Sequence, residues 1–578
     1  MSARRTAVLA IGGISALGLA LRLFGLQYGL PSVYNPDEVA IMARALSFAR
    51  GTLNPHNFLY PTFYFYLLFV WVGVYLGWVW LSGRVASLAA LQQLYFVDPT
   101  GIYTAGRLLG VAAGTATISA VYALATRLTD VRTAIAAAIF LAVAPLHVRD
   151  SHYVKHDVAA TLAIVVAYVA ISRVWPCAHD DRPRQRDTLL AGALCGVAFS
   201  THYYCVFLAI PLALAVVLGW RRRGVAACIR QLLLAGVASV VVFFALSPFL
   251  LVEPLTAWRD ITANRQIVID RAVEAGAFAP AARYLELLRT DAMGGPIALL
   301  GLVGIVWMMA AEPARAVLLL AFPLPFLLFI ANTAPASRYL NPVLPFLAIF
   351  AAWGLARVTR QLAGERTAVY WTGVFLAALP ALGASVESDR FIRQDDTRTL
   401  AERYIEAQLP SGATILTQPY SAVLTPSREG LVEALSRNLG SAEAASTKFQ
   451  LQLTLNPYPS PAYRLVYLGR GGLDADKIYV DPSALGGAAG LEPLRRLGVQ
   501  YVLIKRYNRP DPETLPFLTA LSREGRRIVA FSPYRPGISE AEQARIDPFL
   551  HNTDARIDDA LERPGPPLEI WQLNAPGT

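Results

Sequence analysis

The sequence predicts a polytopic α-helical membrane protein that carries an α/β domain at its C-terminal end. Of its 578 residues, 55% are hydrophobic and only 16% are charged, and the mean hydropathy is +0.42. No soluble globular protein of this length has such a composition. Apolar runs of spanning length recur up to about residue 386, and beyond it helix and strand patterns alternate.

The formal net charge of +10 indicates topology rather than a nucleic-acid partner. The arginines fall in short clusters between apolar runs, which is typical of the cytoplasmic loops of membrane proteins. We therefore predict membrane lipids, and no nucleic acid, among the partners of this chain.

The first span lies at the N-terminus. Residues 1–26, MSARRTAVLAIGGISALGLALRLFGL, begin with basic residues, and no small-residue cleavage site follows the apolar run. Its length is close to the ~20 residues that a spanning helix needs, so we expect an uncleaved span with a cytoplasmic N-terminus. The four cysteines all precede the C-terminal domain and do not identify its compartment: Cys177, Cys195, Cys205 and Cys228.

We expect about eleven spans in all. They lie near residues 6–26, 104–126, 133–149, 157–174, 188–201, 204–220, 231–251, 296–311, 315–332, 339–357 and 368–385. The clusters predicted to be cytoplasmic are Arg4/Arg5, Arg127/Arg132, Arg173 with Arg182/Arg184/Arg186, Arg221 to Arg223 with Arg230, Arg315, and Arg357/Arg360/Arg366. This orientation places on the outer face Asp37, Glu38, Arg107, Asp157, His202, Glu253 and Arg338.

One segment does not fit this scheme as a single span. Tyr60 to Leu81, YPTFYFYLLFVWVGVYLGWVWL, is long enough to cross, but one crossing there would reverse every later loop. Its many Tyr and Trp residues suit the membrane interface, so we favour an interfacial helix over a hairpin of two further spans.

Two domains are predicted, a transmembrane module over residues 1–386 and an α/β domain over residues 387–578, with a first external loop at about 27–103. DDTRTLAERYIEAQLPSGATILTQ has the pattern of a helix, a turn and a strand, and LRRLGVQYVLIKRY, FLTALSREGRRIVAFSPY and PLEIWQL continue it. An odd number of spans places this domain outside the membrane. The glycine-rich turn of a dinucleotide site does not occur there.

The stretch YNPDEVA, Tyr34 to Ala40, carries the most informative pair of ionisable residues. Asp37 and Glu38 follow the first span directly. A purely structural role is a real alternative, because Asn35 suits a helix N-cap, Pro36 suits the first helical position, and acids in a first turn suit the helix dipole.

Three further charges lie at the ends of predicted spans. Asp157 stands in SHYVKHDVAATLAIVV beside Lys155, Arg107 opens GRLLGVAAGTATISAVYAL, and Arg338 stands in SRYLNPVLPFL. Charges at membrane depth are costly and usually functional. The simpler alternatives are a helix-terminal acid and arginines that snorkel to the interface.

These motifs together resemble the GT-C polyprenyl-phosphate-dependent glycosyltransferases. They are NPDE, YPTFYFYLL, GRLLGVAAGTATISAVYAL, SHYVKHDVAATLAIVVAYVA, GVAFSTHYYCVFLAIPLAL and SRYLNPVLPFLAIFAAWGL, in this order over residues 6–385. The sequence is most similar to the protein O-mannosyltransferase and bacterial lipid A aminoarabinose transferase groups. The resemblance implies a multi-pass protein of the bacterial inner membrane, with the C-terminal domain periplasmic or extracellular.

The resemblance also implies a reaction. A sugar would move from a polyprenyl-phosphate donor to a hydroxyl of a lipid, glycan or protein acceptor, with inversion. Asp37 would be the general base, and Glu38 would help to position the acceptor or sugar. The residues implied to contact donor or substrate are Asp157, Arg107, Arg338, Lys155, His202 and Tyr60.

Elementary chemistry makes these roles reasonable. Inverting transfer from a phosphate needs a base for the incoming hydroxyl and cations for the departing phosphate. We expect the low-dielectric surroundings to raise the pKa of the base. Because arginines can hold a monophosphate, no cofactor is required; a divalent cation would be compatible with the site, but nothing in the sequence indicates one.

His202 departs from the pattern of the resembled family, in which STHYY usually has Lys at this position. A neutral imidazole can still donate a hydrogen bond to a phosphate but supplies less charge, and Lys155 could compensate. A turn residue without a ligand is the alternative for His202.

Two other classes of function stay open at this point. A polytopic transporter would also carry polar groups among its spans, although matched broken helices in two halves are not evident. A non-catalytic membrane scaffold with an external binding domain would tolerate replacement of Asp37.

Overall fold

The computed structural model describes residues 3–175, 184–218, 223–275, 279–472, 474–487, 489–509, 511–551 and 557–574. Cys177, Arg182, Arg221 and Arg222 lie outside these residues. The chain divides into two compact units. The helical unit consists of Met1–Leu26, Asp37–Tyr75 and Tyr103–Arg390, and the C-terminal unit consists of Gln27–Pro36, Leu76–Ile102 and Phe391–Thr578.

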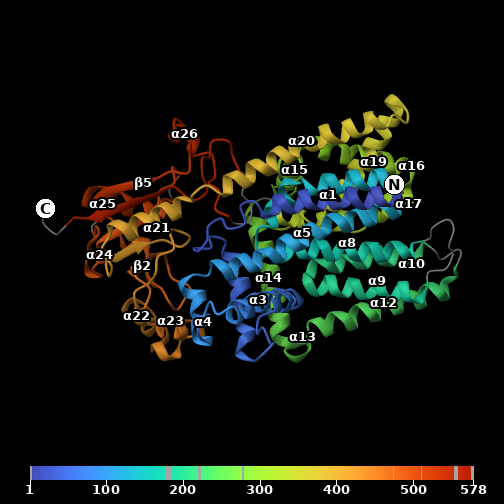
Figure 1. Cartoon of the computed structure of the whole chain (residues 1–578). Coiled ribbons are helices and arrows are strands. Elements are labelled where there is room, and N and C mark those ends of the chain that lie inside the picture. The colour runs from blue at the N-terminus through green and yellow to red at the C-terminus, as the bar shows by residue number, and fades with distance from the viewer. Residues whose placement is uncertain are drawn as a thin grey trace. The chain divides into compact units, whose positions relative to one another are not determined.

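The helical unit is built almost entirely from α-helices (Figure 1). Those that lie wholly or mainly within it are α1 (Ala3–Leu23), α2 (Pro36–Ser47), α3 (Phe63–Leu81), α5 (Thr100–Leu128), α6 (Val131–Ala142), α7 (Pro145–Asp150), α8 (His156–Val174), α9 (Gln185–Thr201), α10 (Ala209–Val217), α12 (Val225–Leu246), α13 (Phe249–Val252), α14 (Pro254–Ala275), α15 (Ala279–Leu287), α16 (Gly295–Ala311), α17 (Pro313–Leu320), α18 (Pro323–Ile330), α19 (Leu344–Ala363) and α20 (Thr367–Ile392).

Small residues bring the long helices together. Helices α8, α9 and α12 lie side by side, and α19 packs against both α6 and α16 (Figure 1). A Cβ at Gly192 of α9 would collide with the backbone of Ala235 on α12, and one at Gly304 of α16 would collide with the carbonyl of Phe350 on α19. Close backbone approach at small residues is how helices associate in membranes, where lipid offers no hydrophobic driving force.

Long apolar helices support a multi-pass membrane protein. In the described chain, six helices are long and apolar enough to cross a membrane, or seven if the bent pair α17 and α18 forms one span. Four shorter apolar helices of 10–17 residues accompany them. Each predicted span overlaps helical residues, but the number of crossings, and whether α3 crosses or lies in the interface, stay predictions.

Prolines account for the two clearest departures from the predicted spans. The span expected over residues 133–149 is two helices, because the chain turns at Val143–Ala144 and α7 begins with Pro145. Proline lacks the N–H that would continue the α6 ladder. Similarly, α17 and α18 are bent by 41°, and α18 begins at Pro323. Both breaks turn part of a predicted span out of line with the rest of it.

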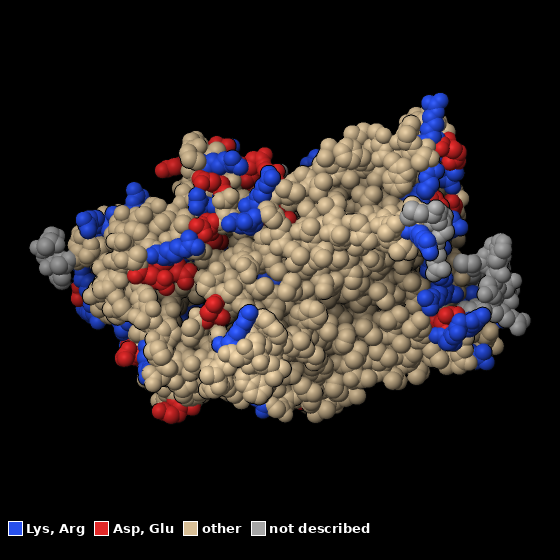
Figure 2. Space-filling view, viewed as in Figure 1, with Lys and Arg blue, Asp and Glu red and all other residues tan. Residues whose placement is uncertain are grey.

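Lysine and arginine gather at one end of the helical unit. In Figure 2 they surround the end where the N-terminus lies, whereas the sides of the unit show very few charges. This distribution matches the expected clustering of arginines in the loops on one side of the membrane. The end of the helical unit at which the N-terminus lies is called the arginine-rich end.

The C-terminal unit contains a six-stranded sheet in the order β3-β2-β1-β4-β6-β5. The strands are β1 (Thr414–Thr417), β2 (Arg464–Leu468), β3 (Ile478–Val480), β4 (Tyr501–Lys505), β5 (Gly525–Phe531) and β6 (Leu568–Leu573). Three pairs, β3–β2, β2–β1 and β1–β4, are parallel, whereas β6 pairs antiparallel with both β4 and β5. The strands expected in ATILTQ, VQYVLIKRY, RRIVAF and PLEIWQL are present, and β2 and β3 were not anticipated.

Helices accompany the sheet in this unit. They are α4 (Leu88–Val97), α21 (Thr397–Gln408), α22 (Arg428–Leu439), α23 (Thr447–Leu453), α24 (Glu492–Arg496), α25 (Leu515–Glu524) and α26 (Glu540–Gln543). Helix α4 packs against α23 although about 350 residues of sequence separate them. The segments Gln27–Pro36 and Leu76–Ile102, which the domain prediction placed in the transmembrane module, thus belong to the C-terminal unit.

A buried polar cluster holds the segment Gln27–Pro36 inside the C-terminal unit. The guanidinium of Arg398 forms two hydrogen bonds to Asp396, of 2.9 and 2.7 Å, and lies 3.9 Å from the ring centroid of Tyr34. Tyr34 Oη lies 2.7 Å from Thr399 Oγ1, and the Asn35 amide donates to the backbone carbonyl of His551. The residues that immediately precede Asp37 are therefore ordered by C-terminal side chains.

The orientation of the chain can be tested by cysteine labelling. Ser522 of α25 and Thr367 of α20 are exposed. With an intact inner membrane and a permeabilised outer one, Ser522→Cys should react with an impermeant maleimide, and Thr367→Cys should react only after the inner membrane is disrupted. The unsubstituted chain measures background from its native cysteines. The reverse labelling pattern would contradict the predicted topology and the outer location of Asp37.

Candidate active site

Asp37 lies between two cations in the helical unit. Its Oδ2 atom is 3.1 Å from Lys155 Nζ and 3.2 Å from Arg338 Nη1. The carboxylate retains 38% of its side-chain exposure, whereas Lys155 retains 9% and Arg338 14%. The acid is therefore accessible, and the two cations are held mainly by protein.

These three side chains lie at helix starts or in turns between helices. Asp37 lies in the first turn of α2, which starts at Pro36, and Lys155 is the residue just before α8. Arg338 lies in the turn Ser337–Leu340 ahead of α19. The sequence places Lys155 and Arg338 within two residues of a predicted span and Asp37 in the loop after the first span, and the fold brings the three together.

Asp157 completes a cluster of four charges. Its Oδ2 atom lies 4.0 Å from Arg338 Nε, and its side chain is 8% exposed. Asp157 Oδ1, His156 Nε2 and the Tyr204 hydroxyl are buried and accept or donate no hydrogen bond within the described chain. Buried polar atoms are normally paired, so three such atoms beside a charge cluster indicate groups that a substrate would pair.

Aromatic rings form the other side of this cluster. Tyr60 stacks on His156 with ring centroids 4.5 Å apart and meets His202 edge-on at 5.3 Å. His202 also stacks on Tyr204 at 3.7 Å. Burial, with His156 and Arg338 nearby, holds the pKa of His202 well below its usual value, so the imidazole is neutral. Tyr60 and His202 thus lie beside His156, the neighbour of Asp157, and their contact with a donor or substrate stays a prediction.

Glu38 and Arg107 do not join this exposed cluster. They form a pair with 0% side-chain exposure, in which Arg107 Nε and Nη2 each donate to a Glu38 oxygen at 2.9 Å. Glu38 Oε1 also accepts from the backbone N–H of Val154 at 3.0 Å, and Arg107 donates to the carbonyl of Leu26. The adjacent acids of NPDE therefore lie in different surroundings, one accessible and one sealed inside.

This geometry changes the roles that we propose for Glu38 and Arg107. Both ionic groups are already paired, and neither is exposed to a substrate. The bond from Val154 to Glu38 ties the loop that carries Lys155 to helix α2. We therefore assign the pair to positioning, in place of the implied contacts with acceptor and donor phosphate.

The expected rise in the pKa of the base is wrong for the free protein. Burial alone would raise the pKa of Asp37, but Lys155 and Arg338 outweigh it, and the pKa lies below the usual value of 3.8. Opposite charges within about 4 Å favour the ionised carboxylate. Asp37 is therefore ionised, and weakly basic, as long as both cations remain on it.

The pH dependence of the reaction follows from this pairing. Because Asp37 must be ionised to accept a proton and its pKa is lowered, its acid limb in kcat/KM should lie below pH 4. Arg338→Gln removes one cation and leaves the burial, so the acid limb should move to higher pH. A pH profile of residual activity tests this, and an unchanged limb in Arg338→Gln would exclude Asp37 as the group that titrates.

Sequence reasoning missed three polar residues next to the cluster. Asn341 donates to Asp150 at 2.6 Å, and Arg149 lies 3.8 Å from the same carboxylate. Arg149 also donates to Ser337, the neighbour of Arg338, at 3.4 Å. Residues 149 and 150 come at the end of a predicted span, and only the helix break at Pro145 brings them here. The proline itself was the available signal.

A metal centre finds no support in the ligand pattern. In the described part of the chain, no group of three or more His, Cys, Asp or Glu side chains is arranged to hold a metal ion. Asp37 and Asp157 are instead separated by the guanidinium of Arg338. Among the described residues, the charge that would stabilise an anion comes from side chains.

Comparison with known proteins identifies the fold. Residues 102–251 match the profile of the family described as dolichyl-phosphate-mannose-protein mannosyltransferase. ArnT from Cupriavidus metallidurans in the apo state superposes with a TM-score of 0.50 at 15% identity, over 90% of this chain and 95% of that one. The chain has the GT-C glycosyltransferase fold. The predicted resemblance to GT-C proteins is thereby confirmed.

Other solved GT-C structures are also similar. ArnT from Cupriavidus metallidurans bound to undecaprenyl phosphate matches at 13% identity with a TM-score of 0.49, over 90% of this chain and 95% of that one. The Archaeoglobus fulgidus oligosaccharyltransferase tethered to an acceptor peptide matches at 13% identity with a TM-score of 0.49, over 87% and 69% of the two chains. No curated sequence matches the chain significantly.

Proposed function

We propose that this GT-C protein is a glycosyltransferase that moves a sugar from a polyprenyl-phosphate donor to an acceptor hydroxyl at the outer face of the membrane. The observation that carries the proposal is the accessible carboxylate of Asp37 held at 3.1 and 3.2 Å by Lys155 and Arg338. These three groups are the base and the phosphate-binding cations that such a transfer needs.

Donor binding would exchange one anion for another at the cations. The lipid phosphate competes with Asp37 for Lys155 and Arg338, and a guanidinium can hold phosphate through two parallel hydrogen bonds. As the cations turn to the phosphate, Asp37 loses the charges that lower its pKa and becomes a stronger base. The donor would thereby activate the base that its own reaction uses.

The transfer step then needs no further protein group. Asp37 accepts the proton of the acceptor hydroxyl while that oxygen forms a bond to the anomeric carbon. The bond from the anomeric carbon to the phosphate oxygen breaks, and the electron pair leaves with the lipid monophosphate, held by Lys155 and Arg338. Attack opposite to the leaving group inverts the anomeric centre.

The remaining polar atoms would recognise the sugar and acceptor. Asp157 Oδ1 and His156 Nε2 are buried without a hydrogen-bond partner in the described residues, and sugars offer hydroxyls that can pair with both. Tyr60 and the neutral His202 present ring faces and edges, which pack against the apolar face of a pyranose ring. The description of the family matched by residues 102–251 names a lipid-phosphate sugar, dolichyl phosphate mannose. The matched range includes Lys155, Asp157 and His202.

Donor affinity tests the proposed role of Arg338. The full chain in detergent is titrated with a radiolabelled polyprenyl-phosphate sugar, beside Arg338→Gln. Loss of one charge-assisted contact should weaken binding by about 10- to 100-fold, since such bonds contribute about 1.5–3 kcal/mol each. Arg259→Gln is the matched control, because Arg259 is 73% exposed and pairs with Asp260 outside the cluster.

Equal donor affinity in the unsubstituted chain and in Arg338→Gln would contradict the proposed phosphate site. A purified chain that carries a solute across liposomes without any lipid-linked sugar would favour the transporter alternative instead. Turnover with a polyprenyl-phosphate sugar and an acceptor would exclude the non-catalytic scaffold.

A further inference from the structure

A second polar pocket lies at the arginine-rich end of the helical unit. It has a volume of about 430 Å³. It is lined by Thr129, Asp130, Arg132, Thr133, Glu312, Arg315, Trp353, Ala356, Arg357, Thr359, Arg360, Gly364, Glu365, Arg366 and Tyr370. Helix α5 separates it from the candidate active site. Arg107, which pairs with Glu38 beside Asp37, lies near the start of α5, and Thr129 of the pocket lies just beyond its end. At 1.5 Å per residue that distance is roughly 30 Å along the helix.

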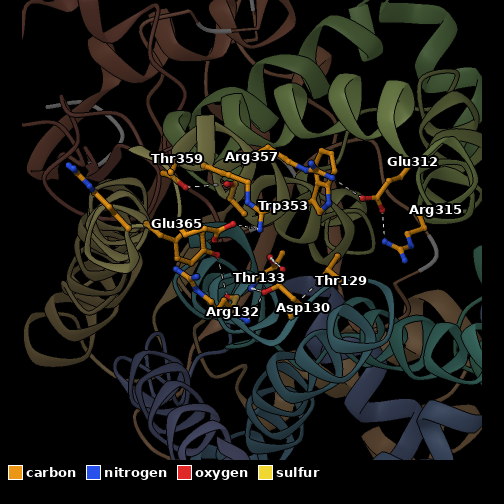
Figure 3. Close-up of a pocket in the computed structure, with 15 residues that line it drawn as sticks. Thr129, Asp130, Arg132, Thr133, Glu312, Arg315, Trp353, Arg357, Thr359 and Glu365 are labelled. Carbon is orange, nitrogen blue, oxygen red and sulfur yellow. Dashed lines mark hydrogen bonds and ion pairs between the residues drawn. The ribbon is translucent and has the colours of Figure 1, made fainter. Parts of the chain in front are cut away.

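The pocket carries an excess of positive charge. Five arginines and three acidic residues line it. Figure 3 shows their side chains converging from the ends of several helices, with Arg357 and Arg315 both reaching Glu312. Glu312 pairs with Arg315 at 2.5 Å and with Arg357 at 3.1 Å, and Glu365 pairs with Arg360 at 2.6 Å.

The third acid, Asp130, caps the N-terminus of α6. Asp130 Oδ1 accepts from the backbone N–H groups of Arg132 and Thr133, and its Oδ2 accepts from the Thr133 hydroxyl at 2.9 Å. This is the N-cap arrangement of α6, in which the carboxylate satisfies the first free N–H groups of the helix. Asp130 therefore does not form an ion pair with an arginine of the pocket.

Arg132 and Arg366 supply the excess charge. Within the described chain neither forms a salt bridge to an acid, and the Arg132 guanidinium lies 5.2 Å from the ring centroid of Tyr370. Arg366 directly precedes α20, whose first turn contains no acidic residue. The positive end of the α20 dipole thus adds to the two arginines on that side of the pocket.

We propose that this pocket binds the phosphate-bearing headgroup of an anionic phospholipid. Arg132 lies over the Tyr370 ring, and Arg366 adjoins the N-terminus of α20. Within the described chain neither pairs with an acid, so both are suited to a phosphate group. The pocket lies where apolar helices end, which is the depth of lipid headgroups. Trp353, whose ring lies 4.8 Å from the Arg357 guanidinium, lines it and suits the boundary between acyl chains and headgroups. Basic pockets between transmembrane helices bind anionic headgroups in this way.

Native mass spectrometry of the full chain with added phosphatidylglycerol or phosphatidylcholine tests the proposal. The unsubstituted chain should retain phosphatidylglycerol in preference to phosphatidylcholine. Arg132→Gln combined with Arg366→Gln should lower the affinity for phosphatidylglycerol about 30-fold, since each arginine close to an anionic membrane surface strengthens binding roughly fivefold. The melting temperature of the double variant should equal that of the unsubstituted chain, because neither side chain is in a salt bridge.

A matched double variant separates the pocket from the general charge of this end. Arg5→Gln with Arg230→Gln removes two exposed arginines that do not line the pocket, and phosphatidylglycerol binding should change less than twofold. Equal losses in both double variants, or retention of the lipid by Arg132→Gln/Arg366→Gln, would overturn the proposal. Displacement of the lipid by millimolar inorganic pyrophosphate, with pyrophosphate bound more tightly than phosphatidylglycerol, would assign the pocket to a soluble phosphate and overturn the lipid assignment.

Discussion

Asp37→Asn is expected to lower the rate of sugar transfer by about 10²–10⁴-fold, the usual contribution of a general base. Asparagine keeps the shape of the side chain and the helix start at Pro36 but cannot accept the acceptor proton. The measurement is single-turnover transfer by the purified chain with a polyprenyl-phosphate sugar and an acceptor. If Asp37 only began helix α2, the change would cost at most about 1 kcal/mol of stability and activity would survive.

Donor binding distinguishes loss of the base from loss of the site. In Asp37→Asn the cations Lys155 and Arg338 lose the carboxylate that lies nearest to both, so the lipid phosphate should bind at least as tightly as in the unsubstituted chain. A variant that loses transfer and donor affinity together would indicate a collapsed site. Normal turnover would show that the acid only caps a helix.

Arg107→Met is expected to destabilise the helical unit by about 3–5 kcal/mol. The change leaves the Glu38 carboxylate buried without its cation, since both side chains of the pair have 0% exposure. The measurement is thermal unfolding of the full chain in detergent, followed beside transfer activity. Because Val154 donates to Glu38, the variant should also loosen the loop that carries Lys155.

The double variant Glu38→Leu/Arg107→Met is the control for this prediction. Removing both charges avoids an unpaired buried ion, so the double variant should be more stable than Arg107→Met alone. Its transfer rate should nevertheless stay low, because Val154 has lost its acceptor. Full stability of Arg107→Met would contradict the positioning role that we assign to the pair.

The broad architecture could be predicted because it depends on composition and periodicity. A spanning helix needs a run of apolar residues, and such runs lie where helices α1, α5, α8 and α20 are found. Strands β1, β4, β5 and β6 were predictable from short β-branched and apolar runs between turn residues. β2 and β3 were missed because no helix pattern directly precedes RLVYL or IYV.

Candidate site residues could be selected from the sequence by residue type and position, but the side chains that each of them contacts could not be predicted. Asp37 was identifiable as an acid after the first span, and Lys155, Asp157 and Arg338 as charges at the ends of later spans. The fold brings these four together. That Glu38 turns inward to Arg107 could not be read from the sequence, because adjacent residues on a helix point in directions about 100° apart. The direction of the Asp37 pKa shift depends on those same tertiary distances.

The unit to which the start of the first external loop belongs could not be predicted from the sequence either. Pattern alone assigned residues 27–36 to the transmembrane module, yet Tyr34 and Asn35 are bonded to residues of the C-terminal unit. Those contacts join residues more than 360 positions apart in the chain. Local sequence carries no signal for such pairings.

The most direct test of the proposed phosphate site is the position of a bound lipid phosphate, seen by electron cryomicroscopy of the full chain with a polyprenyl phosphate. The phosphate should lie within hydrogen-bond distance of Lys155 Nζ and the Arg338 guanidinium, with the Asp37 carboxylate displaced from both. A phosphate bound elsewhere in the helical unit, with Lys155 and Arg338 still paired to Asp37 at 3.1 and 3.2 Å, would contradict it.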